Sequence, residues 1–139
     1  MKPIGYQILE IGKLFKEDVK KKAEKDGIPS TWFQILRVLR HKDNEITQKE
    51  ICEETNMKAP TISIALTNME SEGLIIRKRD EIDNRRIFVY LTNEGLNISK
   101  NIHNYFVQSD SLLENSVTKE ELDIFYLCLS KMKEVLSND

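Results

Sequence analysis

The chain has 139 residues, of which 40% are hydrophobic and 32% are charged, a balance typical of a folded globular protein rather than a disordered one. The 21 basic and 23 acidic residues give a net charge of -2, which by itself gives no support to nucleic-acid binding. No apolar run approaches the roughly 20 residues that span a bilayer, and charges interrupt the apolar start of the chain, so we expect neither membrane contact nor a signal peptide.

Apolar residues recur at helical spacing over residues 4–25, which predicts an amphipathic helix. Gly27 and Pro29 should end it. A capping box at Thr31–Gln34 predicts the start of a second helix, whose sequence WFQILRVLRH is apolar on nearly all sides and should lie in the core. The run DNE at residues 43–45 then breaks the helical pattern.

The next segment predicts two helices joined by a tight turn. Thr47–Glu50 is a second capping box, and it opens a short helix that ends near Thr55. Pro60 fits the first position of the following helix, because its missing N–H has no partner there. Gly73 is suited to end that helix. Two helices joined in this way form a helix-turn-helix.

A hairpin should follow directly. Leu74–Arg79 and Ile87–Leu91 have the alternation and composition of strands, and Asp80–Arg86 connects them as a loop. A helix-turn-helix followed by a two-stranded hairpin is a winged helix. The predicted fold class is therefore mainly α with a small β-hairpin wing.

Two longer helices should complete the chain. Thr92 is suited to cap a helix that runs to about Asn115, and Thr118–Glu121 is a third capping box for the last helix. The last helix has two apolar faces, and a terminal helix of that kind needs two packing partners. We infer that one face packs on its own domain and the other on a second subunit, which predicts a homodimer.

The pattern as a whole resembles the MarR family of multiple-antibiotic-resistance regulators. The resemblance is carried by TWFQILRVL, ITQKEICEETNMKAPTISIALTNMESEGLI and DNRRIFVYLTNEG, the last of which matches the family's wing signature of Asp-x-Arg, a strand and LT-x-x-G. It covers essentially the whole chain. It implies one domain over residues 1–139, with a winged helix-turn-helix for DNA binding at 30–95 and a helical dimerisation region at 1–28 and 96–139.

The resemblance also implies a function. Such a chain would be a cytoplasmic homodimer that represses or activates genes by binding a pseudo-palindromic operator in double-stranded DNA, and we expect a repressor. A small aromatic or phenolic effector, or an oxidant, is expected to weaken that binding. The resemblance calls for no cofactor.

On the hairpin, Arg85 matches the family's wing arginine, which enters the minor groove, where narrow A·T-rich DNA concentrates negative potential. Asp83 matches the acidic residue that holds this arginine in position. The neighbouring cations would contact phosphates, which add affinity without sequence information: Arg77, Lys78, Arg79 and Arg86. The alternative is a solvated hairpin whose charges prevent edge-strand aggregation. The helix-turn-helix directly upstream favours the wing.

In the second helix of the helix-turn-helix, a buried stripe is expected at Ile62, Ala65, Leu66 and Met69. The residues expected at the DNA are Lys58, Pro60, Thr61, Ser63, Ile64 and Thr67, with Ser71 on the same side. Small hydroxyls there can reach base edges, and the helix dipole favours phosphate at the helix start. The alternative is that this polar face is simply solvated.

Ile64 departs from the family pattern, in which its position is often basic. We hypothesise that Ile64 contacts the C5-methyl group of a thymine, the apolar feature that base pairs present in the major groove. The alternative is that Ile64 packs sideways against the wing or the preceding helix.

The remaining reactive residues suggest neither a catalytic nor a metal site. Cys52 and Cys128 lie far apart in sequence, which suits a reducing cytoplasm, and their apolar neighbours predict buried structural thiols. His41 and His103 have no metal-ligand spacing. No nucleophile–base pair, phosphate loop or paired carboxylates are present, so no enzyme is predicted. Core packing is expected, ahead of a role in a pocket, for Tyr6, Trp32 and Phe33.

A second function stays open beside DNA binding. Residues 31–92 carry ten basic and ten acidic side chains, so the region of the winged helix is neutral. The alternative is therefore a winged-helix protein-interaction module without DNA binding.

Overall fold

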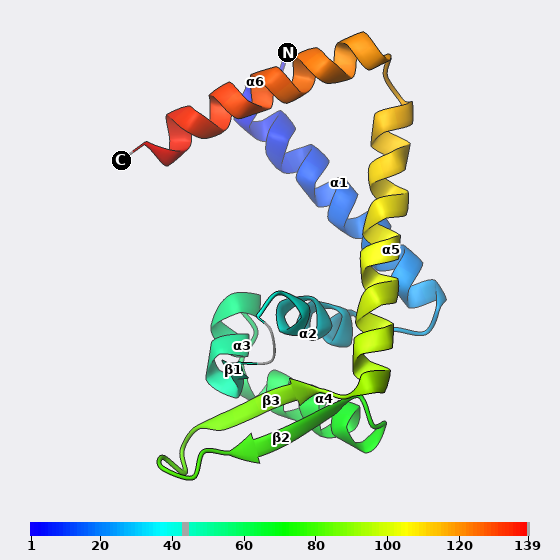
Figure 1. The fold of residues 1–139 in the computed structure, drawn as a ribbon. Helices are drawn as coiled ribbons and strands as arrows, with labels where there is room; N and C mark the ends of the chain where they lie inside the picture. The colour runs from blue at the N-terminus through cyan, green and yellow to red at the C-terminus, as the bar shows by residue number, and fades with distance from the viewer. Residues whose placement is uncertain (43–44, 139) are drawn as a thin grey trace. The chain divides into compact units, whose positions relative to one another are not determined.

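Helices make up most of the chain in the computed structural model, which describes residues 1–42 and 45–138. In chain order the elements are α1 (Ile4–Lys25), α2 (Ser30–His41), β1 (Ile46–Thr47), α3 (Gln48–Thr55), α4 (Ala59–Ser71), β2 (Ile75–Arg79), β3 (Ile87–Leu91), α5 (Asn93–Asn115) and α6 (Lys119–Ser137) (Figure 1). The chain forms two units, Met1–Tyr105 and Phe106–Asp139, and α5 runs from the first into the second. The predicted fold class is confirmed.

Two details of the helix starts differ from the predictions. The capping box predicted at Thr31–Gln34 is wrong: α2 begins at Ser30, after Pro29, and no side chain caps it. The fixed φ of proline places Pro29 in the extended conformation of an N-cap without help from a hydroxyl. Pro60 is the second residue of α4 instead of the first, and its missing N–H lies in the first turn in either position. The break predicted at 43–45 falls mostly on residues 43 and 44, which lie outside the described residues.

The other two capping boxes are confirmed. The hydroxyl of Thr47 accepts a hydrogen bond from the Glu50 backbone N–H at 3.2 Å, and the Glu50 carboxylate accepts one from the Thr47 backbone N–H at 3.3 Å. Thr118 caps α6 in the same way. Asn56, in the left-handed region with φ 56°, turns the chain from α3 towards α4, and Gly73, with φ 78°, ends α4 as predicted.

The sheet contains one strand more than predicted. Its order is β1-β3-β2, and both pairs are antiparallel. β1 has only two residues, and Ile46 pairs with Val89 and Thr47 with Phe88. A strand of two residues cannot show an alternating pattern, so no sequence signal predicts it. β2, β3 and the loop Asp80–Arg86 form the hairpin, which is called the wing below.

One hydrophobic core holds the helix-turn-helix against the inner face of the sheet. Its fully buried side chains come from α2, α3, α4 and all three strands: Ile35, Leu36, Leu39, Ile46, Ile51, Ile62, Leu66, Met69, Ile75 and Val89. Burying one such aliphatic side chain stabilises a fold by about 1.5–3 kcal/mol. The buried stripe predicted on α4 is therefore confirmed, and it fixes which side of α4 remains outside.

Thr92 and Gly95 join α5 to the turn that precedes β2. The Thr92 hydroxyl accepts from the Gly95 backbone N–H at 3.1 Å, which caps α5 as predicted, and donates to the Gly73 carbonyl at 2.5 Å. The Thr92 backbone N–H donates to the Leu74 carbonyl at 3.0 Å. A Cβ at Gly95 would overlap that same carbonyl oxygen and lie 3.1 Å from Leu91 Cδ2. This close approach explains the glycine that ends the LTNEG segment.

Apolar side chains stay exposed on the first and last helices. On α1 they are Ile4, Tyr6, Ile8, Leu9, Ile11 and Leu14, and on α6 they are Ile124, Phe125, Tyr126, Leu127, Val135 and Leu136. α6 contains no buried residue, so neither of its predicted apolar faces is fully covered within the chain. Several large apolar side chains exposed on one helix are typical of an interaction site on a folded protein.

Gly95→Ala should lower the free energy of unfolding by about 1–3 kcal/mol, because the added methyl group meets a backbone carbonyl that cannot move without disturbing β2. Urea unfolding followed by circular dichroism measures the change. The control is Asn97→Ala, which places an alanine at an exposed position in the same helix. Equal stability of the two variants would show that the close approach is not there.

Candidate nucleic-acid interface

α4 lies at the surface of the first unit, with one side in the core and the other in solvent. Away from its buried stripe it presents four exposed residues that recur three or four positions apart, called the outward line below: Pro60, Ile64, Thr67 and Ser71. Ile64 is 65% exposed, so the alternative in which it packs sideways against the wing or α3 is wrong. Lys58, the N-cap of α4, and Thr61 are also exposed, while Ser63 is half-buried.

Two hydroxyls of the outward line donate within their own helix. Thr67 Oγ1 donates to the Ser63 carbonyl at 2.9 Å, and Ser71 Oγ donates to the Asn68 carbonyl at 2.8 Å. Such back-bonding is a common choice for Ser and Thr inside helices. The sequence predicted that hydroxyls on this face reach base edges. In the structure, the protons of the Thr67 and Ser71 hydroxyls are hydrogen-bonded to carbonyl groups of the same helix.

Arg77, the third residue of β2, bonds to α4. Its backbone N–H donates to Glu70 Oε2 at 2.9 Å, and its Nη2 lies 3.1 Å from Glu70 Oε1 and 3.2 Å from Thr67 Oγ1. The backbone hydrogen bond from Arg77, more than the guanidinium charge, lowers the pKa of the Glu70 carboxyl below its ordinary value. The Arg77 side chain, expected at a phosphate, is only 23% exposed and is turned towards α4.

Arg85 is far more exposed than Arg77 or Arg86. Its side chain is 92% exposed, and its Nε donates to Asp83 Oδ1 at 3.3 Å. The same carboxylate oxygen accepts from the Arg85 backbone N–H at 3.1 Å. Asp83 therefore restrains the backbone N–H and Nε of Arg85 and leaves the far end of the guanidinium in solvent. This is the arrangement that the sequence predicted for the pair.

The other wing cations have partners on the wing itself. Arg79 Nη1 donates to the Asn84 carbonyl at 2.8 Å, across the loop. Arg86 lies 3.7 Å from an Asp80 carboxylate oxygen and above the Phe88 ring, 5.0 Å from its centre. These contacts shape the loop and leave both guanidinium charges near the surface. Lys78 stands over the Tyr90 ring on the outer side of the sheet.

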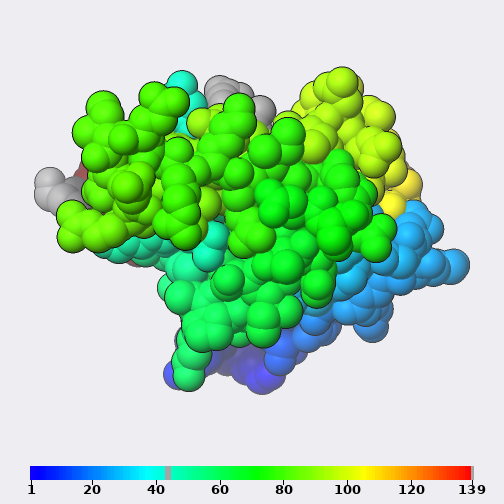
Figure 2. Space-filling model, turned by 90° about the horizontal axis from the view of Figure 1, so that it is seen from below, coloured from blue at the N-terminus to red at the C-terminus, as the bar shows by residue number. Residues whose placement is uncertain are grey.

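The wing and α4 share one face of the first unit. α4 packs against β2, and the space-filling view from below shows the green atoms of both elements exposed next to one another (Figure 2). The exposed surfaces of α4 and the wing therefore lie on the same side of the first unit. The sequence could indicate each element, but not that they share a face.

Other residues singled out in the sequence lie elsewhere. Cys52 and Cys128 are each half-buried, so the prediction of buried thiols is wrong for both. Trp32 and Phe33 pack against the core as predicted, whereas Tyr6 is exposed and does not. Among the described residues there is no group of three or more His, Cys, Asp or Glu side chains placed to hold a metal ion. None of the described helices combines the length and apolarity needed to cross a bilayer.

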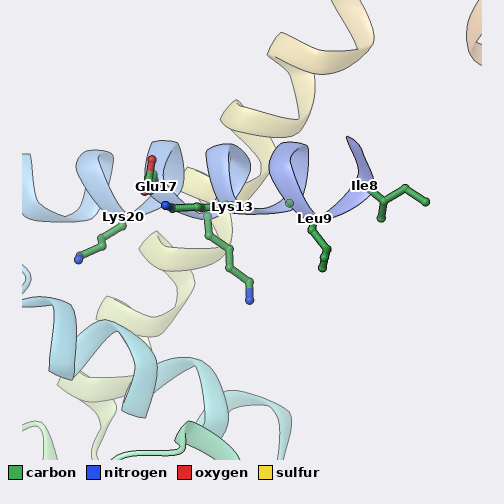
Figure 3. A pocket seen from close by; sticks show the side chains of 7 residues that line it. Ile8, Leu9, Lys13, Glu17 and Lys20 are labelled. Carbon is green, nitrogen blue, oxygen red and sulfur yellow. The ribbon is translucent and has the colours of Figure 1, made fainter. Parts of the chain in front are cut away.

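A shallow hollow lies along α1 (Figure 3). Its lining residues all belong to that helix: Ile8, Leu9, Gly12, Lys13, Lys16, Glu17 and Lys20. Because a single helix supplies every lining residue, the hollow is an open strip of helix surface and does not enclose a ligand. Its apolar end is continuous with the exposed apolar side chains of α1.

A helix-turn-helix with its second helix exposed beside an arginine-tipped hairpin defines the class of winged helix-turn-helix proteins. Residues 26–86 match the MarR family. The HTH-type transcriptional regulator YdgJ of Bacillus subtilis is 30% identical over 115 residues, which cover 81% of this chain and 68% of YdgJ. The transcriptional repressor YetL of the same organism is 28% identical over 113 residues, which cover 80% of this chain and 67% of YetL. The chain belongs to the MarR family.

Solved structures agree with this assignment. MepR, a transcription regulator of the Staphylococcus aureus multidrug efflux pump MepA, superposes with a TM-score of 0.82 at 26% identity over 98% of this chain and 100% of that one. MepR in complex with DNA gives a TM-score of 0.69 at 26% identity, over 97% of this chain and 99% of that one. YdgJ, YetL and MepR are all transcriptional regulators, which agrees with the prediction that the chain is not an enzyme.

Glu70→Gln should lower the free energy of unfolding at pH 7 by less than about 1 kcal/mol, since the bonded carboxylate is partly exposed. The pKa of Glu70 is lowered in the folded state, so its contribution is present above the unfolded pKa and is lost as pH falls through the folded pKa. Urea unfolding from pH 7 down to acid should show wild type and variant converging. The control Glu72→Gln, two residues away and exposed, should change little. A constant difference at every pH would contradict the assignment.

Proposed function

We propose that this chain is a cytoplasmic DNA-binding transcriptional regulator, acting as a repressor, that binds a pseudo-palindromic operator as a homodimer. The observation that carries the proposal is the shared face of α4 and the wing, together with the Arg85 side chain that Asp83 holds in the wing loop and leaves 92% exposed. The likeness to MepR, which has been crystallised in complex with DNA, supports it further.

The proposed interface divides between the two grooves. α4 enters the major groove, which is wide enough for a helix, and Arg85 enters the minor groove. The residues proposed to form the interface are Lys58, Pro60, Thr61, Ser63, Ile64, Thr67, Arg77, Arg79, Asp83, Arg85 and Arg86. Because its guanidinium is bonded to Glu70 and Thr67, Arg77 contributes mainly by holding the wing to α4.

The rest of the chain has a place in the same proposal. Residues 30–95 bind DNA, and residues 1–28 and 96–139 form the dimerisation region within one MarR-type domain. The exposed apolar side chains of α1 and α6 support this, because a second subunit would remove them from water. We also propose that a small aromatic or phenolic effector releases the protein from its operator. Membership of the MarR family supports this part of the proposal.

The alternative, a winged-helix protein-interaction module, makes a different prediction for DNA. A regulator neutralises phosphates and releases counterions, so its affinity for random-sequence duplex should fall linearly with the logarithm of salt concentration. A protein-interaction module should show little affinity at any salt concentration. Fluorescence anisotropy with a labelled random duplex separates the two functions.

Arg85→Ala should weaken binding to a duplex that the wild-type protein has selected from a random-sequence library, by about 1–3 kcal/mol. The fold should stay intact, because the Arg85 side chain lies outside the core. Asp83→Ala should have a smaller effect in the same direction, since Asp83 only orients the arginine. Anisotropy titrations measure both.

Lys25→Ala, which removes one exposed positive charge at the end of α1, is the control for net charge. If Arg85→Ala binds like wild type while Arg77→Ala does not, the groove-entering arginine has been assigned to the wrong residue.

The chain should be a dimer in solution, because α1 and α6 each leave several large apolar side chains in water that a second subunit would cover. Static light scattering at micromolar concentration should give about twice the chain mass of 16.2 kDa. Leu127→Lys, at an exposed apolar position of α6, should shift the mass towards the monomer, whereas Lys131→Gln should not. A monomeric wild type would exclude binding to two half-sites about one helical turn apart.

A further inference from the structure

The outward line of α4 carries no charge. Pro60, Ile64, Thr67 and Ser71 are all exposed, and the single charged residue of the helix, Glu70, is bonded to Arg77. The commonest specific contact to guanine is a bidentate bond from Arg or Lys to O6 and N7. α4 has no side chain that can make it. Lys58 at the N-cap can reach guanine only at the start of the helix, so the middle of the outward line, at Ile64 and Thr67, recognises something other than the guanine acceptors.

The hydroxyl of Thr67 already has two partners. Its proton goes to the Ser63 carbonyl at 2.9 Å, and its oxygen accepts from Arg77 Nη2 at 3.2 Å. One lone pair of the oxygen and the methyl group remain for a groove, so the residue has no proton to donate to an acceptor on a base. Ile64 lies three positions earlier on the same side of the helix, where side chains are neighbours. Together the two residues form an apolar patch at the middle of the outward line.

We propose that α4 recognises thymine through this patch. The Ile64 side chain and the Thr67 methyl group contact the C5-methyl groups of two thymines in the major groove of each half-site, since those methyl groups are the apolar feature of the base-pair edges there. This rests on the proposed function and names the sequence class that the interface selects. The wing cations supply affinity, and the apolar patch supplies discrimination between bases.

Each methyl contact should have a measurable effect on the affinity for DNA. Burying one methyl group is worth about 0.8 kcal/mol, which corresponds to about a four-fold change in affinity for each methyl contact in each half-site. Uracil pairs with adenine as thymine does and lacks only the methyl group. Replacing a contacted thymine by deoxyuridine in both half-sites should therefore weaken wild-type binding by about the square of that factor, roughly sixteen-fold, and replacing other thymines should not.

The experiment begins with duplexes selected by the wild-type protein from a random-sequence library. Each thymine of the selected duplex is then replaced by deoxyuridine in both half-sites, and affinities are measured by anisotropy. Ile64→Ala should become insensitive to replacement at one position. Thr67→Ser, which keeps the hydroxyl and loses the methyl, should become insensitive at a second position. Thr67→Val, which keeps the methyl and loses the hydroxyl, should stay sensitive there.

The outcomes separate the inference from the proposed function. If selection enriches no duplex, sequence-specific binding fails, and the proposed function of recognising an operator fails with it. If a duplex is enriched but no thymine-to-uracil change weakens wild type more than Ile64→Ala, the apolar contact does not exist. If Thr67→Val loses discrimination and Thr67→Ser keeps it, the hydroxyl makes the contact, and the inference is overturned. Because both positions are exposed, all three variants should fold, which thermal melting checks.

Discussion

The Glu70 carboxylate connects the two parts of the candidate interface, because both of its oxygens bond to Arg77. One oxygen receives the backbone N–H of β2 at 2.9 Å, and the other receives the guanidinium at 3.1 Å. α4 and the wing thus have a polar connection outside the core as well as the apolar one inside it. An arginine at the wing tip and a helix in the major groove can engage one duplex only if their separation is fixed, and this connection helps to fix it. The same guanidinium also donates a hydrogen bond to the Thr67 hydroxyl oxygen. One acceptor position of that hydroxyl on α4 is therefore no longer available to DNA.

The placement of charge matters more here than its total. Residues 31–92 are neutral overall, and several of their cations have acidic or carbonyl partners: Arg77, Arg79 and Arg86. Arg85 also has a partner, but Asp83 bonds to its backbone N–H and Nε and leaves the side chain 92% exposed. A few well-placed cations are enough to locate a duplex, because phosphate contacts act locally at physiological salt. The uncharged outward line of α4 then leaves the choice of sequence to shape and apolar contact.

Much of this fold could be predicted from the sequence, because local signals agreed with the final structure. The capping boxes at Thr47 and Thr118, the glycine stop at Gly73 and the alternation of β3 each reflect interactions within a few residues. The features that the sequence did not predict depend on contacts between residues farther apart in the chain. β1 exists only through its pairing with β3, and Glu70 bonds to Arg77 in the following strand, a contact that depends on how the turn between α4 and β2 folds. Arg77 could be recognised as a wing cation, but only the structure shows that its charge is directed to α4.

The central claim is that α4 and the wing tip together contact duplex DNA. Hydrogen–deuterium exchange of the full chain, with and without a random-sequence duplex at low ionic strength, tests it directly, because contacts to phosphates do not depend on sequence. The account predicts slower exchange at the start of α4, near Lys58, and in the loop Asp80–Arg86, with α2 unchanged. Exchange that is unaffected in both of these segments, or slowed only in α1, would contradict it.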